Sequence, residues 1–133
     1  MTTRKSHPDL ALVPTIHRAT HRIGLYLQSH RPALGVTQAE AHILSHLCHR
    51  PPSTIAALHE AFGHRRSTLT SILDRLQERG LVVREGDPTD RRSFVVVLTP
   101  KGRRVARRTC AVLGALEGAA VRLAGSKALR DFE

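Results

Sequence analysis

The hydrophobic period of the chain changes from 3.6 residues to two residues just after Gly80, and this change constrains the fold more than any other feature. Residues 81–85 and 93–98 are short Val-rich runs of strand character, separated by a turn-forming segment at 86–92. A β-hairpin is therefore expected directly after a helix. That helix is indicated by apolar residues at the spacing of one helical face: Leu69, Ile72, Leu73 and Leu76.

Capping residues predict another helix immediately upstream. A cap at Ser53 or Thr54 begins a short helix, and Gly63, which suits the left-handed conformation, ends it. The next helix is expected over residues 65–79. Two helices joined by a tight glycine turn and followed by a hairpin form a winged helix-turn-helix. The sequence thus predicts a mostly α-helical fold with a small β-hairpin wing.

Further helices flank this unit on both sides. An amphipathic helix is expected over residues 9–30, and a capping box between Thr37 and Glu40 begins a second one. A Thr-Pro pair at 99–100 begins a long helix, with a break expected at residues 125–126 and a short tail after it. We interpret the 133 residues as a single domain.

The charge of the chain points to a polyanionic partner. It carries 21 Lys and Arg against 11 Asp and Glu, and residues 65–108 hold 12 of these basic residues but only five acidic ones. A folded basic domain with such a local cluster is typical of nucleic-acid-binding proteins, which are favoured here over binders of an anionic membrane. Aromatic residues make up only 3% of the chain. Single-stranded nucleic acid is disfavoured, because its binders stack bases on aromatic side chains.

Other function classes find no support in the sequence. It contains no nucleophile elbow, phosphate-binding loop or HExxH motif, so neither an enzyme activity nor a cofactor is expected. Cys48 and Cys110 form no CxxC pair, which argues against a zinc knuckle and a disulfide framework. Two free thiols fit a reducing compartment, and no apolar run is long enough to span a bilayer. A cytoplasmic location is therefore expected.

Two segments carry a more specific signature. Residues 90–99 read DRRSFVVVLT, which fits the pattern DxRxxxxxLT. Residues 67–76 read STLTSILDRL and are followed by RGLV at 79–82. In these motifs the chain resembles the MarR family of transcriptional regulators, and the resemblance extends from about residue 36 to residue 108.

The resemblance implies a sequence-specific transcriptional regulator, expected to be a repressor, that binds a pseudo-palindromic double-stranded DNA operator as a homodimer. The helices at 9–30 and 100–133 would form the dimerisation region, and residues 36–99 would form the winged helix-turn-helix lobe that binds DNA. A small-molecule effector or another signal would release the DNA by changing the spacing of the two lobes.

The second helix of a helix-turn-helix enters the major groove by its N-terminal end, where Arg, Ser and Thr side chains reach bases or phosphates. Arg75, farther along this helix, is a candidate for a phosphate contact. On the wing, the resemblance assigns insertion into the minor groove to Arg92, with Asp90 orienting its guanidinium, and Arg91 is expected to add a phosphate contact. The full set of expected DNA-binding residues is Arg65, Arg66, Ser67, Thr68, Thr70, Ser71, Arg75, Asp90, Arg91 and Arg92.

Nine histidines raise the question of a sensor site. His17 and His21 are one helical turn apart, as are His42 and His46, and such pairs can bind zinc. A packing or solvated role is favoured over a metal site, because the paired histidines that zinc-sensing relatives carry in their fifth helix have no counterpart here. These four residues are expected instead to line an effector pocket.

Two alternatives to a ligand-released regulator stay open at this stage. A non-specific architectural DNA-binding protein would also be small and basic, and a zinc- or redox-sensing regulator would share the fold. Peroxide-sensing relatives carry a reactive cysteine in the first helix, where this chain has none. Cys48 is expected to be a small core residue, and Cys110, on the last long helix, would allow a symmetric disulfide between protomers.

Overall fold

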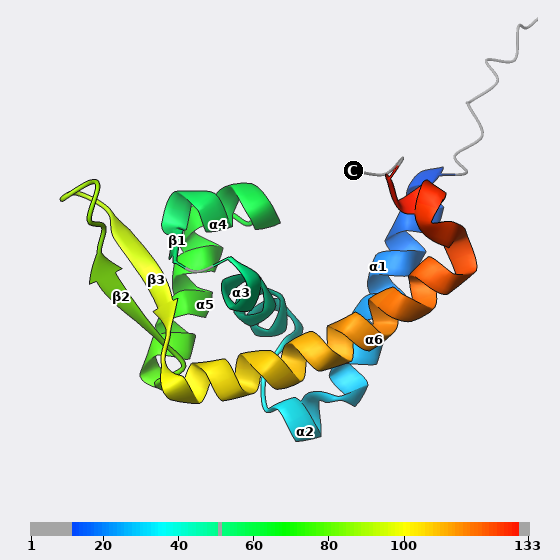
Figure 1. The fold of residues 1–133 in the computed structure, drawn as a ribbon, viewed down its shortest axis with the longest axis horizontal. Helices are drawn as coiled ribbons and strands as arrows, with labels where there is room; N and C mark the ends of the chain where they lie inside the picture. The colour runs from blue at the N-terminus through cyan, green and yellow to red at the C-terminus, as the bar shows by residue number, and fades with distance from the viewer. Residues whose placement is uncertain (1–11, 51, 131–133) are drawn as a thin grey trace, which may run out of the picture.

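The helices and strands follow the chain in the expected order, with two additions, α2 and β1. The computed structural model describes residues 12–50 and 52–130, and side chains as far as residue 123 (Figure 1). The elements are α1 (Leu12–Ser29), α2 (Arg31–Leu34), α3 (Gln38–His49), β1 (Ser53–Thr54), α4 (Ile55–Phe62), α5 (Arg66–Glu78), β2 (Val82–Gly86), β3 (Phe94–Leu98) and α6 (Pro100–Arg130).

The capping residues set the ends of α3 and α4 as the sequence predicts. At the start of α3 the Thr37 hydroxyl accepts from the Glu40 amide at 3.3 Å, and the Glu40 carboxylate accepts from the Thr37 amide at 2.9 Å. Thr54, rather than Ser53, caps α4, because its hydroxyl accepts from the Ala57 amide. Gly63 ends α4 with a φ of 62°, a left-handed conformation that glycine adopts without steric cost.

The sheet has one strand more than the predicted hairpin. Ser53 and Thr54 pair with Val96 and Val95, so that β1 adds to the outer edge of β3 and the strand order is β1-β3-β2. All pairs are antiparallel. A strand of two residues carries no hydrophobic period, and only the tertiary pairing reveals it.

The helices differ from the expected ones in two places. Between the first expected helix and the capping box at Thr37 lies the single-turn helix α2, whose Pro32 is in the first turn, where a missing amide proton costs little. No break occurs at Gly125 and Ser126, because α6 continues to Arg130. A single glycine costs a helix only about 1 kcal/mol, and the neighbouring Ala, Leu and Lys residues are good helix formers. Residues 9–11 and 131–133 of the expected terminal helices lie outside the described residues.

The core lies where α3, α5, the sheet and the first turns of α6 meet, and α4 contributes Leu58 to it. The predicted inward face of α5 is confirmed, since Leu69, Ile72, Leu73 and Leu76 are all buried. In contrast, the N-terminal part of the apolar stripe of α1 is uncovered within the single chain. Leu12 and Ile16 expose 67% and 46% of their surface.

A tight contact fixes the base of the hairpin on the start of α6. The Thr99 hydroxyl donates to the Gly80 carbonyl at 2.6 Å and accepts from the Gly102 amide at 2.9 Å, which confirms Thr99 as the cap. A Cβ atom at Gly102 would lie 1.7 Å from the carbonyl oxygen of Leu81, so that only glycine fits. The wing therefore projects from one end of α6, while the distal part of α6 and α1 stand at the opposite end of the molecule (Figure 1).

Candidate DNA-binding surface

Helix α5 presents a polar face to solvent because its apolar face is buried in the core. Among the predicted contact residues of this helix and its N-cap, every side chain is exposed. The Ser71 hydroxyl donates to the Ser67 carbonyl at 3.0 Å and keeps only its acceptor capacity for a ligand. The exposed set comprises Arg65, Arg66, Ser67, Thr68, Thr70, Ser71 and Arg75.

The N-terminal end of α5 is open to an anion. Arg65 occupies the N-cap position, and its side chain makes no capping hydrogen bond to the first turn. The first amides of a helix have no partner within the helix, and with the helix dipole they favour a bound phosphate. Arg65 and Arg66 add two exposed positive charges at this end. This combination suits the binding of a phosphate backbone.

The tip of the wing is shaped by two aspartates that act on the backbone. The Asp87 carboxylate accepts from the amide and the hydroxyl of Thr89, at 2.9 and 2.8 Å. The hydrogen bond from the Thr89 amide is the main cause that holds the pKa of Asp87 below its ordinary value. Asp90 accepts from the backbone amide of Arg92 at 2.9 Å. The tip is therefore a folded turn rather than a loose loop.

The role predicted for Asp90 needs a correction. Its carboxylate was expected to orient the guanidinium of Arg92, but it binds the backbone amide instead. The short aspartate side chain folds back on its own turn, since the amide two residues ahead lies within reach. In the described part of the chain, neither Arg91 nor Arg92 forms an ion pair, and both side chains are exposed. Their charges face solvent without a partner.

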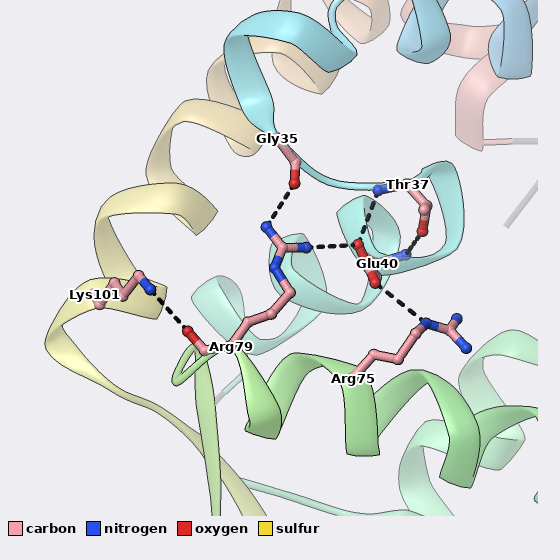
Figure 2. Close-up of polar contacts among 6 residues, drawn as sticks. All are labelled: Gly35, Thr37, Glu40, Arg75, Arg79 and Lys101. Atoms are coloured by element: carbon pink, nitrogen blue, oxygen red, sulfur yellow. Dashed lines mark hydrogen bonds and ion pairs between the residues drawn. The ribbon is translucent and has the colours of Figure 1, made fainter.

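A polar network around Glu40 attaches the recognition helix α5 to α3, and sequence reasoning missed it (Figure 2). Glu40 is only 2% exposed. Its carboxylate lies 3.1 Å from Arg79 Nη1 and 3.6 Å from Arg75 Nε, in addition to the capping-box bond with Thr37. The capping box was visible in the sequence, but the partners on α5 lie far along the chain. Arg75, predicted to contact phosphate, is thus already held at its Nε.

The same network reaches the connection before α3 and the start of α6 (Figure 2). Arg79 Nη2 donates to the carbonyl of Gly35 at 2.6 Å, and the ammonium of Lys101 donates to the carbonyl of Arg79 at 2.8 Å. On the wing side, Arg84 of β2 donates to Asp74 at 2.7 Å and to Gln77 at 2.9 Å. The orientation of α5 is therefore fixed by polar contacts with α3, α6 and the wing.

The histidines do not form the single pocket that the sequence suggests. His17 and His21 line a hollow of about 450 Å³ between α1, α2 and the start of α3, together with Arg31, Thr37 and other residues. His42 and His46 are not among its lining residues. The centre of the His46 ring instead lies 5.4 Å from that of the Phe62 ring of α4. Of the four histidines expected in one effector pocket, two line this hollow and two do not.

Burial lowers the pKa of His42, and the nearby His64 lowers it further. Burial also lowers the pKa of His46, with a smaller effect from Arg50. Both shifts favour the neutral ring, as expected for an imidazole removed from water. Among the described residues, no group of three His, Cys, Asp or Glu side chains is arranged to hold a metal ion.

The comparisons with known proteins agree with this geometry. The MarR family model matches residues 34–93. The transcriptional regulator HosA of Escherichia coli is 30% identical over 94 residues, which cover 67% of this chain and 70% of HosA. The chain belongs to the MarR family. The residues that match the family model contain α4, α5 and strand β2 of the wing.

Other curated relatives match over shorter shares of their length. A regulatory protein assigned to the hcr operon of Thauera aromatica is 35% identical over 68 residues, which are 51% of this chain and 41% of that protein. The uncharacterised regulator YcgE of Bacillus subtilis is 32% identical over 99 residues, which are 73% of this chain and 64% of YcgE. The match therefore spans less than two thirds of the length of each of these two relatives.

Solved structures with the same fold include two DNA complexes. The MepR–DNA complex of S. aureus superposes with a TM-score of 0.79 at 16% identity and covers 93% of this chain and 91% of MepR. The repressor CouR, bound to a 23-mer DNA duplex, has a TM-score of 0.73 at 26% identity and covers 98% and 92%. BpsR of Bordetella bronchiseptica, whose DNA binding is regulated by 6-hydroxynicotinic acid, has a TM-score of 0.75 at 24% identity and covers 95% of each chain. MepR and BpsR are less than 25% identical to this chain, so their similarity shows a shared fold and nothing further.

Proposed function

We propose that this regulator binds a pseudo-palindromic double-stranded DNA operator as a homodimer and represses transcription until an effector releases it. The open N-terminal end of α5 carries the proposal: it combines an uncapped helix end with exposed Arg65 and Arg66. The two guanidiniums suit guanine edges in the major groove, and the free amides suit a phosphate.

The wing supplies the second contact in this proposal. Arg92 enters a narrow minor groove, whose negative potential attracts an unpaired guanidinium. The hydrogen bond from the Arg92 amide to Asp90 fixes the backbone of the tip, so less conformational entropy is lost when the side chain binds. Arg91 and Arg75 contact phosphates on either side, with Arg75 using the part of its guanidinium that Glu40 leaves free.

Dimerisation explains the exposed apolar residues at the end of the molecule away from the wing. Leu12, Val13, Ile16 and Leu25 of α1 and Leu123 of α6 are all exposed in the single chain, Leu123 to 91%. Several large apolar side chains left exposed at one end of a molecule are typical of an interface. A second copy that covers α1 and the distal part of α6 would place two winged lobes at half-sites about one helical turn of DNA apart.

The hollow between α1 and α3 is the proposed effector site. His17, His21 and Arg31 line it, and so does Thr37, the cap of α3. Thr37 shares the Glu40 carboxylate with Arg75 of α5 and with Arg79, which follows the last residue of α5. A ligand that displaces the start of α3 would therefore shift the recognition helix. BpsR, which has the same fold, is regulated by a small molecule.

The test is a gel shift on DNA upstream of the chain's own coding sequence, with bulk genomic DNA as competitor. A sequence-specific regulator keeps its operator complex in excess competitor, whereas an architectural protein loses it. The assay is repeated with phenolic compounds, zinc and oxidants. Release by one of them identifies the signal class.

We propose further that the protein acts in the cytoplasm and is not an enzyme. Its relatives are transcriptional regulators, and the chromosome of a bacterium lies in the cytoplasm. Within the described residues, no helix is both long and apolar enough to cross a membrane.

A further inference from the structure

The fold brings together the two cysteines, which lie far apart in the sequence. Cys48 is in the last turn of α3, Cys110 is in α6, and the two helices pack against each other. The Cys110 thiol donates to the Ser45 carbonyl with a sulfur–oxygen distance of 3.9 Å. Ser45 and Cys48 are three residues apart and share one face of α3. The two cysteines therefore lie near each other across the packed helices α3 and α6.

The surroundings of the two thiols differ. Cys48 lines a cavity of about 230 Å³ that also contains Arg103 and Arg107 and has an apolar floor. A small oxidant can enter such a cavity, where it would lie beside Cys48, Arg103 and Arg107. Cys110 is not among the lining residues. Burial raises the pKa of the Cys110 thiol, against a smaller lowering effect from its hydrogen bond to Ser45, and the neighbouring Cys48 raises it further. Cys110 is accordingly the poorer first nucleophile.

An unused hydroxyl lies on the residue that contacts Cys110. The Ser45 Oγ atom is buried and has no hydrogen-bond partner among the described residues. Buried polar atoms are nearly always paired, so an orphan of this kind calls for an explanation. A sulfenic acid formed at this interface would offer it both a donor and an acceptor.

We propose that Cys48 and Cys110 form a dithiol that a hydroperoxide oxidises to a disulfide within one chain, tying α3 to α6. The Cys48 thiolate attacks one peroxide oxygen, the O–O bond breaks, and the departing oxygen takes a proton to become an alcohol or water, which leaves Cys48 as a sulfenic acid. The Cys110 sulfur then attacks the Cys48 sulfur. The S–O bond breaks, and the hydroxide leaves as water with the Cys110 proton. The two thiols together lose two electrons to the peroxide.

This pairing replaces the symmetric disulfide between protomers that the sequence suggested for Cys110. In the structure the Cys110 thiol lies against Ser45 of its own chain, on the face of α3 that also carries Cys48. A disulfide requires Cα atoms about 4.4–6.8 Å apart. Packed helices have axes about 8–10 Å apart and Cα atoms about 2.3 Å from each axis, so facing residues reach about this separation. Helix α3 also holds α5 through Glu40. If the proposed function is right, oxidation therefore lowers operator affinity, by about tenfold at the usual strength of such coupling.

The experiment exposes the full-length protein to hydrogen peroxide and measures its intact mass and thiol content without reductant. We expect a mass lower by two hydrogen atoms, a monomeric band on a non-reducing gel, one peptide pair joining Cys48 to Cys110, and reversal by dithiothreitol. In Cys110→Ser a dimedone probe captures the Cys48 sulfenic acid. In Cys48→Ser the remaining thiol stays reduced under the same exposure.

A linkage only between chains, separate oxidation of both thiols without a bridge, or thiols that stay reduced would overturn the pairing. A gel shift of the oxidised and re-reduced protein then tests its effect on DNA. Equal affinity of the two forms would refute the coupling to α5 but not the disulfide. Failure of both forms to bind DNA would refute the proposed function, while the mass result stands by itself.

Discussion

The guanidinium of Arg79, at the end of the recognition helix, lies 3.1 Å from the carboxylate of Glu40, which is almost fully buried at the start of α3. The same carboxylate completes the capping box with Thr37 and lies 3.6 Å from Arg75. The Glu40 side chain thus caps the start of α3 and also holds α5 against α3. A buried carboxylate is tolerated only where hydrogen bonds and opposite charges surround it.

We expect Glu40→Ala to lower the free energy of unfolding by about 1–3 kcal/mol, because the substitution removes the capping box and both contacts to α5. The arginine side chains are 51% and 42% exposed, so water compensates part of the lost ion pairing. Urea denaturation measures the change. Glu78→Ala, which removes an exposed carboxylate from the same helix as the arginines, serves as the control. Equal stability of the two variants would show that the network contributes nothing.

We expect Arg92→Ala to weaken operator binding by about tenfold or more without changing the unfolding temperature, because the side chain is exposed and unpaired. Arg104→Ala removes an exposed guanidinium from the first turns of α6, outside both the expected DNA-binding residues and the proposed dimer surface, and should leave affinity close to that of the natural protein. A gel shift compares the two variants. If both variants reach half-maximal DNA binding at the same protein concentration, the wing tip does not contact DNA.

Operator affinity should fall steeply with salt, because each neutralised phosphate releases counterions. In a plot of log K against log salt, Arg66→Ala should reduce the magnitude of the slope by about one. Fluorescence anisotropy at several salt concentrations gives both slopes. If Arg66→Ala changes affinity but leaves the slope unchanged, Arg66 reads a base or supports the helix rather than binding a phosphate.

Gly102→Ala should destabilise the fold by at least about 1–3 kcal/mol, because its Cβ would overlap the Leu81 carbonyl oxygen and separate the wing from α6. Gly114→Ala provides a matched substitution in the same helix, where nothing lies within 4 Å of the added carbon. That variant should gain about 0.5–1 kcal/mol from helix propensity. Thermal unfolding of the pair measures the difference, and two stabilised variants would contradict the contact.

Stability should decrease as the pH falls below 6.5, the ordinary value of histidine, because the folded state lowers the pKa of His42. Above that pH the ring is neutral in both states and contributes no difference. Below it the unfolded chain takes up the proton first, and the loss grows until the pH reaches the lowered pKa of the folded state. His46 acts in the same direction. Thermal unfolding across this range should show a weaker dependence in His42→Gln, and an unchanged dependence would assign it to other groups.

The sequence by itself determined most of the helix-turn-helix and the wing. The apolar spacing of α5, the capping box at Thr37 and the change of period after Gly80 are local signals, since each depends on residues within a few positions of one another. The exposed polar face of α5 followed from the same spacing, because a helix that buries one side must expose the other.

Only the tertiary structure decided which distant residues meet. The contacts of Glu40 with Arg75 and Arg79, the third strand at Ser53 and Thr54, the separation of His17 and His21 from the other two histidines, and the approach of Cys48 to Cys110 depend on how α3 packs against its neighbours. Helical period shows which face of α3 is buried, but it does not show which side chain of another helix lies opposite. Those contacts depend on how all the core side chains pack together, and the spacing of residues within a single segment does not report that packing.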